Sequence, residues 1–340
     1  MRKISRTGAM IAAAATAVGA LAFVGTTLAT MASAAPAAPA AATSAMTGYQ
    51  FTTLDNANDV TFNQLLGINN RGEIAGYLGS GAAGQPNKGY RLYPPYTQRD
   101  YASENFPGSV QTQVTGLNDS GDTVGFWSSM NTKSMVNNNF GFYKLNGQTA
   151  HTVVFPTGDN ASPVTDQLLG INDHDVAVGF YTNGQGSNRG YAYNIRTHQF
   201  TRVLVPGYPS GVAGPSLTAA AINNYGDIAG FYTDGTNTTD AFLQYARGGF
   251  VTLDVPGASS TTALGVNDHD EVVGDYTVGT GSNAAMHGFT WTARGGFVTV
   301  NDPHGTDTTT INGVNDAGDL VGFYVDSHGN TDGLLASPQR

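Results

Sequence analysis

Five aromatic residues, spaced 44 to 54 residues apart, could provide stacking surfaces for sugars. They are Trp127, Tyr181, Tyr232, Tyr276 and Tyr324. Trp and Tyr combine an apolar face with a polar tip, so they suit sugar stacking and also ordinary packing with the tip hydrogen-bonded. Two interpretations stay open: a ring of ligand-binding platforms, or packing between neighbouring sheets.

Asp275 stands at a position where the other members of a second series are aromatic. Those members are Tyr77, Phe126, Phe180, Phe231 and Phe323. A carboxylate in such surroundings costs free energy unless it has a partner. Asp275 is therefore either a buried or pocket carboxylate, which makes it a candidate for ligand binding, or a solvated one at a locally open edge.

Two polar loops begin and end with Asp at the same spacing and could bind Ca²⁺. They run from Asp234 to Asp240 and from Asp326 to Asp332. Carboxylates are hard oxygen ligands that suit this ion, although the spacing is not that of an EF-hand. Turns in which Asp or Asn side chains bond the local backbone explain the composition equally well. We expect no cofactor other than this calcium ion.

Familiar catalytic motifs are absent from the sequence. It contains no GxSxG nucleophile elbow, no HExxH zinc motif and no GxxxxGK[ST] phosphate loop. Carboxylates are numerous enough for a glycosidase or a lyase, but the sequence alone does not pair them. We therefore favour a function without catalysis.

The composition predicts short strands joined by turns. Among 340 residues, 45 are Gly, 12% are charged and 40% are hydrophobic. Low Lys, Glu and Arg content with many Gly, Thr, Asn and Tyr residues disfavours helices, and the apolar share excludes a disordered chain. The net charge of −10 argues against nucleic-acid binding, which needs a basic surface. The chain has no Cys, so its stability must come from burial.

The chain is an array of six repeats. They read GINNRGEIAGYL, GLNDSGDTVGFW, GINDHDVAVGFY, AINNYGDIAGFY, GVNDHDEVVGDY and GVNDAGDLVGFY, and their first Asn residues are Asn69, Asn118, Asn172, Asn223, Asn267 and Asn315. Periods of 40 to 50 residues indicate one supersecondary unit per repeat. The Asn-turn joins a first and a second strand, with a positive φ expected at Gly72, Gly121, Gly226 and Gly318 and at Asp175 and Asp270.

Each repeat holds four strand candidates, which predicts a β-propeller. The second strand is apolar on both faces, which indicates a sheet that is covered on both faces. It continues with a Gly in all six repeats, which indicates close approach of another backbone segment. The last repeat ends after its third strand, whereas Tyr49–Asp55 resembles an unmatched fourth strand. We expect an all-β, six-bladed β-propeller with four antiparallel strands per blade, closed by the N-terminal strand pairing with the C-terminal blade. An open solenoid or a sandwich is the alternative.

The repeat resembles the extracellular HAF-repeat family of bacteria. The motif Gly-Ile-Asn-x-x-Gly-x-Ile-x-Gly-x-Tyr is followed by Asp240-Ala241-Phe242 or His287-Gly288-Phe289, and then by a Phe-Val-Thr-Leu-Asp-Val-Pro-Gly run. The resemblance covers about residues 49–337. It implies export and a repetitive β fold, and it implies no established reaction.

The N-terminus predicts export. Arg2, Lys3 and Arg6 precede an apolar stretch that ends in a small-residue cleavage pattern at Ala34. We expect a signal peptide at 1–34, an Ala/Pro-rich linker at 35–48 and a single propeller domain at 49–340. The alternative is an uncleaved anchor. The mature chain should be secreted, monomeric and without a membrane span.

The expected function is a binding or interaction module. The loops between second and third strands vary in length and composition, and such loops on a rigid scaffold commonly carry binding sites. The ligand at that mouth of the channel would be a polysaccharide or an extracellular protein. The alternatives are a carbohydrate-active hydrolase or lyase on the same scaffold and a structural envelope or matrix protein.

Overall fold

The computed structural model describes residues 48–130, 137–207, 215–233 and 238–339. The predicted signal peptide, nearly all of the predicted linker and the calcium candidate Asp234 lie outside these residues. The part of the chain that the structure describes is built of strands, with two short 3₁₀ helices, η1 (Gln98–Asp100) and η2 (Gly281–Asn283). None of its helices is long and apolar enough to cross a membrane.

Four-stranded antiparallel sheets form the first three repeats. The first contains β2 (Asn63–Ile68), β3 (Ile74–Leu78), β4 (Lys88–Leu92) and β5 (Tyr101–Ser103), and the second contains β6 (Gln111–Leu117), β7 (Thr123–Met130), β8 (Asn137–Lys144) and β9 (His151–Val153). The third contains β10 (Asp166–Ile171), β11 (Val176–Thr182), β12 (Asn188–Asn194) and β13 (Gln199–Arg202). The predicted all-β class and the four-stranded antiparallel units are confirmed.

The fourth and fifth repeats share one eight-stranded sheet. Its strands are β14 (Ser216–Ile222), β15 (Ile228–Thr233), β16 (Thr239–Gln244), β17 (Phe250–Leu253), β18 (Ser260–Val266), β19 (Val272–Val278), β20 (Ala285–Thr292) and β21 (Gly296–Val300). One parallel residue pair, Thr239 with Ser260, joins its two halves. The described residues therefore form five sheets when hydrogen bonding alone defines them.

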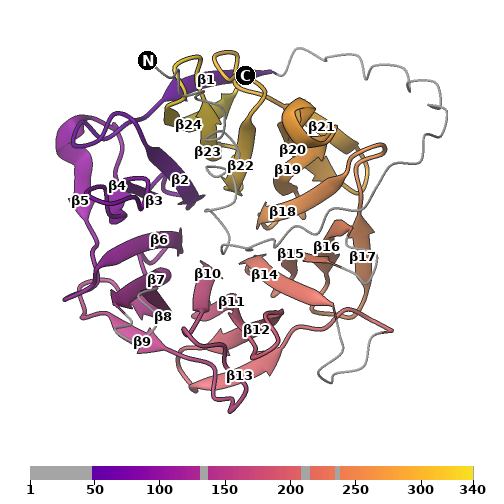
Figure 1. The fold of residues 1–340 in the computed structure, drawn as a ribbon. Coiled ribbons are helices and arrows are strands. Elements are labelled where there is room, and N and C mark those ends of the chain that lie inside the picture. Colours follow the sequence, from indigo (N-terminus) through magenta and orange to yellow (C-terminus); the bar gives the residue numbers. More distant parts are fainter. Residues whose placement is uncertain (1–47, 131–136, 208–214, 234–237, 340) are drawn as a thin grey trace, which may run out of the picture. The chain divides into compact units, whose positions relative to one another are not determined.

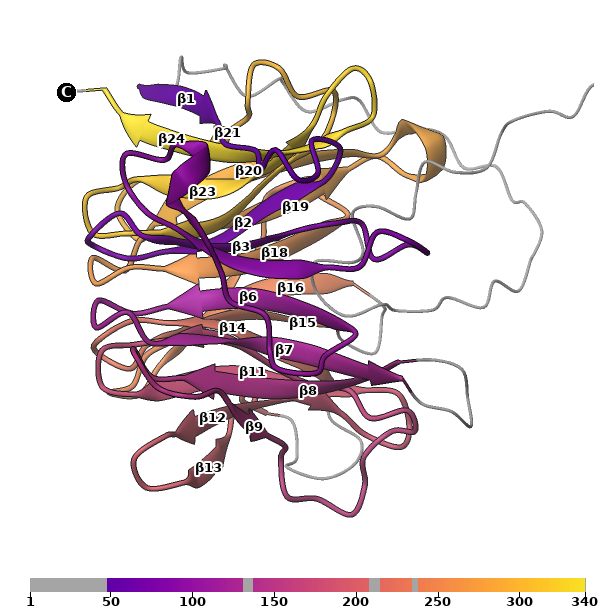
Figure 2. The same cartoon turned by 90° about the vertical axis from the view of Figure 1, so that its left-hand side faces the viewer.

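The last sheet combines the two ends of the described chain. It contains β22 (Thr309–Val314), β23 (Leu320–Val325), β24 (Thr331–Pro338) and the N-terminal β1 (Tyr49–Thr53). Strand β1 lies antiparallel to β24, with Phe51 opposite Ala336 and Thr53 opposite Leu334. Figure 1 shows the sheets arranged around a central axis, with β2, β6, β10, β14, β18 and β22 nearest to it. Figure 2 shows the turns gathered at two opposite ends of the strands.

The glycine in each second strand is required by a bulge in the first strand. The strand pairing shifts register by one residue at this bulge in all six repeats, for example between Leu168 and Gly170. A Cβ atom built on Gly179 would collide with the carbonyl oxygen of Gln167. Equivalent carbonyls face the other five glycines. The predicted close backbone approach is confirmed, and its cause lies within each sheet.

The core lies between the faces of neighbouring sheets. In one interface, Ala229 and Leu243 of the fourth repeat pack against Val272 and Phe289 of the fifth. Similar apolar clusters recur between the other repeats. This packing covers both faces of each second strand, as its sequence predicts.

Candidate functional site

The Asn-turns at one end of the strands have the predicted conformation. Gly72, Gly121, Gly226 and Gly318 have φ between 75° and 85°, and Asp175 and Asp270 take the same left-handed region at 58° and 56°. The leading Asn is buried in every repeat, with an exposed fraction of 3–5%. The turns are thus part of the folded core.

Each leading Asn uses both ends of its amide. The Oδ1 atom of Asn223 accepts hydrogen bonds from the backbone N–H groups of Tyr225 and Asp227, at 3.0 and 2.9 Å. Its Nδ2 group donates to the carbonyl oxygen of Asn267 and to the carboxylate of Asp227, both at 3.2 Å. Asp lacks this donor and Ala lacks both functions, which explains why the repeat needs Asn.

The Asn side chains link the six turns into a cycle. Each Nδ2 group donates to the backbone carbonyl of the leading Asn in the next repeat, at 2.9–3.3 Å, in the order Asn69, Asn118, Asn172, Asn223, Asn267, Asn315 and back to Asn69. The last bond joins residues 246 positions apart in the sequence. The cycle ties the first repeat directly to the sixth.

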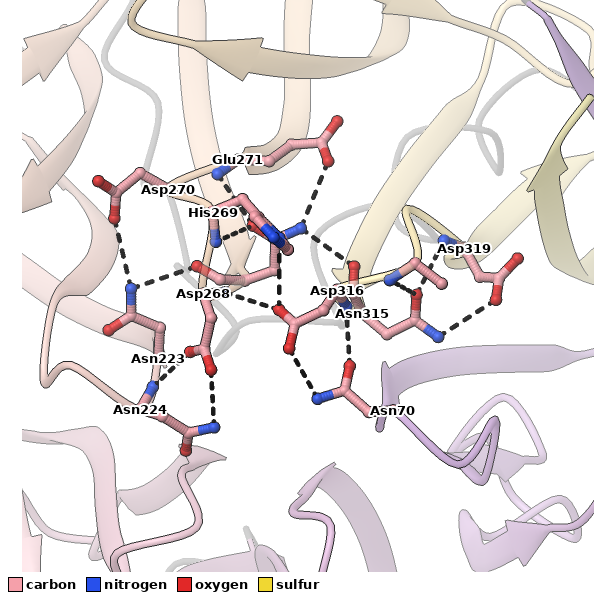
Figure 3. A network of polar contacts seen from close by, with 12 residues as sticks. Asn70, Asn223, Asn224, Asp268, His269, Asp270, Glu271, Asn315, Asp316 and Asp319 are labelled. Atoms are coloured by element: carbon pink, nitrogen blue, oxygen red, sulfur yellow. Dashed lines mark hydrogen bonds and ion pairs between the residues drawn. The ribbon is translucent and has the colours of Figure 1, made fainter. Parts of the chain in front are cut away.

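The residues that follow the leading Asn form a second cycle nearer the solvent. They are Asn70, Asp119, Asp173, Asn224, Asp268 and Asp316, and a side-chain oxygen of each accepts the backbone N–H of a neighbouring member at 2.7–2.9 Å. The amides of Asn70 and Asn224 also bridge the carboxylates on either side of them. Figure 3 shows part of this network, with Asn224 beside Asp268 and Asn70 beside Asp316.

The channel enclosed by these turns is narrow. Two cavities of about 70 Å³ each lie along it and share six lining residues, Ile68, Leu117, Ile171, Ile222, Val266 and Val314. The outer cavity is lined by the Asn and Asp residues of the turns. These volumes fall well below the roughly 300 Å³ at which ligand pockets begin. Neither cavity therefore has the size of an ordinary ligand pocket.

The aromatic candidates lie at the opposite end of the strands and reach across their own sheets. Each polar tip approaches a side chain of the outermost strand: Trp127 approaches Thr152, Tyr181 approaches Arg202, Tyr232 approaches Thr252, Tyr276 approaches Thr299 and Tyr324 approaches Thr53, at 2.7–3.3 Å. We call each such contact an aromatic clamp. The clamp holds the second strand of a sheet to its outermost strand.

The rings in these clamps are mostly covered. Tyr181, Tyr232 and Tyr324 have exposed fractions of 1%, 8% and 4%, so they offer no open face to a sugar. Trp127 and Tyr276 are half-buried, and Trp127 stacks on Phe106 with ring centroids 4.5 Å apart. The packing interpretation accounts for these contacts.

The side chain opposite the aromatic residue varies among the five clamps, which use four residue types. The cross-strand partners are Phe140, Arg189, Asp240, His287 and Asp332, in chain order. These residues lie in the first half of the third strands, toward the end that carries the variable loops. The aromatic clamp thus recurs in five repeats, while the residue beside it on the third strand varies.

Carboxylates gather at the clamp of the last sheet. Burial raises the pKa of Asp55 to about 6, the N–H group of Gly333 lowers it, and the charges of Asp332 and Asp326 raise it further. The backbone N–H of Gly333 donates to Asp55 Oδ1 at 2.9 Å. Burial also raises the pKa of Asp332, and a hydrogen bond from Tyr324 opposes this effect. Two half-buried or buried acids thus lie close together at this clamp.

Asp275 is buried, with an exposed fraction of 8%. The hydroxyl of Thr262 lies 2.9 and 2.7 Å from its two carboxylate oxygens. Burial raises the pKa of Asp275 to about 6, and the Thr262 hydrogen bond lowers it. The prediction of a locally open, solvated edge is wrong, because neighbouring repeats cover this position.

The loop from Asp326 to Asp332 closes on itself. Asp326 Oδ1 accepts the backbone N–H groups of His328 and Asn330 at 2.7 and 2.8 Å, and its Oδ2 accepts the Asn330 amide at 3.0 Å. Burial raises the pKa of Asp326, but the backbone and side-chain hydrogen bonds from Asn330 and His328 together outweigh it and lower the pKa to about 2. Within the described residues, no group of three or more His, Asp or Glu side chains could hold a metal ion. The turn interpretation accounts for this loop.

Of the second calcium candidate loop, Asp240 pairs with Tyr232 in the neighbouring strand, and Asp234 lies outside the described residues.

Two features of the third sheet escape sequence reasoning. Arg202 occupies a clamp position that is Thr in the other four clamps of the described chain. Asp166 is fully buried and accepts hydrogen bonds from the Tyr191 hydroxyl at 2.5 Å and from the Phe155 N–H at 2.7 Å. Burial raises the pKa of Asp166 to about 7, while both hydrogen bonds lower it. Aligning the fourth strands of the repeats would have marked Arg202 as an exception.

No family model and no curated protein matches the sequence. Among solved structures, the chain is similar to an ulvan lyase, described as a new family of polysaccharide lyase, at 14% identity and a TM-score of 0.42, over 81% of this chain and 78% of that chain. It is also similar to SapL1 lectin in complex with alpha methyl fucoside, at 11% identity and a TM-score of 0.48, over 78% of this chain and 88% of that chain. A third match is the β-propeller domain of the Trilobed protease from Pyrococcus furiosus, at 7% identity and a TM-score of 0.43, over 82% and 94% of the two chains. Likenesses at this level assign no function, so the function must be argued from the side chains.

Proposed function

We propose that the protein is an exported, monomeric six-bladed β-propeller of the HAF-repeat type that binds a polysaccharide at the end carrying the variable loops. The count of six is supported by the cycle of six Asn-turns. It is also supported by the single residue pair that joins the halves of the eight-stranded sheet. The pairing of β1 with β24 supports closure of the ring. The N-terminal sequence supports export.

The observation that carries the binding function is the set of aromatic clamps. Each clamp fixes the outer and second strands of one sheet, and the five clamps have Phe, Arg, Asp or His opposite the aromatic residue. A rigid frame with variable polar and aromatic side chains is how a binding surface is built. Sugars, with many hydroxyl groups and apolar ring faces, suit Asp, His, Arg and aromatic side chains. An extracellular protein remains the alternative ligand for the same surface.

The test of this proposal is retention of the full mature chain on a panel of immobilised soluble polysaccharides, with reducing-end release measured in parallel. We expect retention on at least one polysaccharide with no product. The variant His287→Ala changes the residue opposite the aromatic Tyr276 at the loop-bearing end, and Ser120→Ala changes an exposed residue on the Asn-turns. Retention that H287A weakens and S120A preserves supports the loop-bearing end. Absence of retention throughout contradicts polysaccharide binding and favours the two alternatives, an extracellular protein ligand or a structural protein.

A carbohydrate-active hydrolase or lyase is the second candidate, and one observation favours it. Asp55 and Asp332 lie close enough for the charge of Asp332 to raise the pKa of Asp55. An acid with a pKa near 6 beside a second carboxylate is suited to general acid and base catalysis. Release of reducing ends that Asp55→Asn abolishes, and that the exposed control Asp307→Asn retains, would establish this function in place of simple binding.

A further inference from the structure

A pair of arginines lies between the second and third sheets, at the loop-bearing end. Arg202 is on β13 and stands opposite Tyr191 of β12, whereas Arg189 of β12 stands opposite Tyr181 of β11. Since Arg189 and Tyr191 are two residues apart on one strand, all four side chains share one face of the third sheet. Phe155, which follows β9 of the second sheet, packs on this face against Tyr181, with ring centroids 4.7 Å apart.

Arg202 is exposed but held in place. Its Nη2 group donates to the Tyr181 hydroxyl at 2.7 Å. Its guanidinium carbon lies 5.6 Å from the centre of the Phe155 ring and 5.8 Å from that of the Tyr181 ring. No carboxylate forms an ion pair with Arg202 among the described residues. One contact to a neutral hydroxyl leaves most of its five N–H donors for a ligand.

Arg189 adds a second positive charge on the same face of the third sheet. It has an exposed fraction of 9%, and its Nη1 group donates to the carbonyl oxygen of Pro215 at 2.9 Å. Burial lowers the pKa of Arg189, and the positive charge of Arg202 lowers it further. The negative charges of Tyr181 and Asp159 act in the opposite direction and raise this pKa. The charge of Asp159 offsets part of this positive charge, whereas Asp166 is already bonded to Tyr191 and to the Phe155 backbone.

This concentration of positive charge is unusual for the chain. The protein has 25 acidic and 15 basic residues, and the other four clamps of the described part use Thr where the third sheet uses Arg202. A Thr is sufficient to hold the aromatic residue, so the clamp itself does not require a cation. An anionic ligand does require one, and an arginine whose orientation is already fixed binds it at lower entropic cost.

We propose that Arg202, with Arg189 on the same face of the third sheet, binds the carboxylate or sulfate group of an acidic polysaccharide between the second and third sheets. The proposal rests on the polysaccharide-binding function above and specifies the class of polysaccharide. The guanidinium fork of Arg202 makes paired hydrogen bonds to two oxygens of the anion. The Tyr181 hydroxyl, which accepts from Arg202, keeps its own proton available for a further hydrogen bond.

The experiment is isothermal titration of the mature protein with three polymers: polygalacturonate, which carries carboxylates, carrageenan, which carries sulfates, and neutral galactan. We expect at least tenfold tighter binding to one acidic polymer than to galactan. Arg202→Gln should weaken that binding about tenfold to a hundredfold, with galactan unaffected. The control Arg247→Gln removes an equal charge from an exposed position elsewhere and should change nothing. Arg202→Lys keeps the charge without the fork and should lie between the wild type and R202Q.

The outcomes separate this inference from the function on which it rests. Equal binding of acidic and neutral polymers overturns the anion site and leaves polysaccharide binding intact. Equal losses in R202Q and R247Q show a general charge effect and also overturn it. Absence of binding to a wider polysaccharide panel refutes the proposed function itself. Thermal melting of each variant shows whether it folds, and the intermediate affinity expected of R202K would not arise from unfolding.

Discussion

Replacing Asn223 with Asp tests the role of the Asn cycle with an almost isosteric change. The substitution keeps the oxygen that accepts from Tyr225 and Asp227 and removes the donor to the Asn267 carbonyl and the Asp227 carboxylate. The new oxygen would face both acceptors at about the 3.2 Å now spanned by hydrogen bonds. Asp270 Oδ1 also lies 3.4 Å from this nitrogen, which adds a further negative charge.

The expected cost of N223D is about 4 kcal/mol at pH 7. Each buried acceptor left without a partner costs about 1–3 kcal/mol, and two are created here. The loss should shrink as the pH falls toward 4, because the introduced carboxyl group regains one donor when it is protonated. Urea unfolding followed by tryptophan fluorescence gives the difference from the midpoint at unchanged slope. The exposed control Asn283→Asp should change stability by less than about 0.5 kcal/mol. A cost for N223D within about 1 kcal/mol of that control would refute the proposed role of the cycle.

Three further predictions concern the sheets and loops. Gly179→Ala should lower the free energy of unfolding by more than about 3 kcal/mol, because the added Cβ meets a backbone carbonyl. The control Gly158→Ala has open space around it and should be tolerated. Similar melting temperatures for the two variants would contradict the bulge explanation. Asp275 has a folded pKa of about 6, above its unfolded value, so the native state loses up to about 3 kcal/mol as the pH rises from about 4 to about 6. Asp275→Asn should therefore flatten this slope and stabilise the protein at pH 7, and an unchanged pH profile would refute the burial argument. Because Asp326 is already bonded within its own loop, EDTA should not shift the melting temperature relative to excess Ca²⁺, and a fall of several degrees would restore the calcium interpretation.

Features encoded by local backbone bonding could be predicted from the sequence. An Asn that bonds the N–H groups two and four residues ahead forms the same turn wherever it occurs, so Asn69 and Asn315 share a geometry despite their separation. The positive φ of Asp175 follows from the same turn. The glycine of the second strand was also predictable as a close approach, although the bulge that causes it needs the paired strand.

Features that depend on packing between distant segments could not be predicted in this way. Tyr324 reaches Thr53, 271 residues away, and only the paired strands show that its tip lies against the outer strand. The burial of Asp275 depends on the neighbouring repeats, which no property of its own strand reveals. Arg202 is a single cation in a variable strand, and only the folded structure shows that Tyr181 and Phe155 lie beside it and fix its orientation.

The proposed ring closes where β1 pairs with β24, and a disulfide across these two strands tests that pairing most directly. The chain has no Cys, so the double variant Gln50→Cys with Ser337→Cys places its only two thiols on residues that face each other in β1 and β24. Mild oxidation followed by proteolysis and mass spectrometry should show an intramolecular crosslink between these residues. The crosslink should raise the unfolding free energy by up to about 5 kcal/mol until it is reduced. Free thiols or crosslinks only between molecules, under conditions where the protein is folded, would contradict the closed ring.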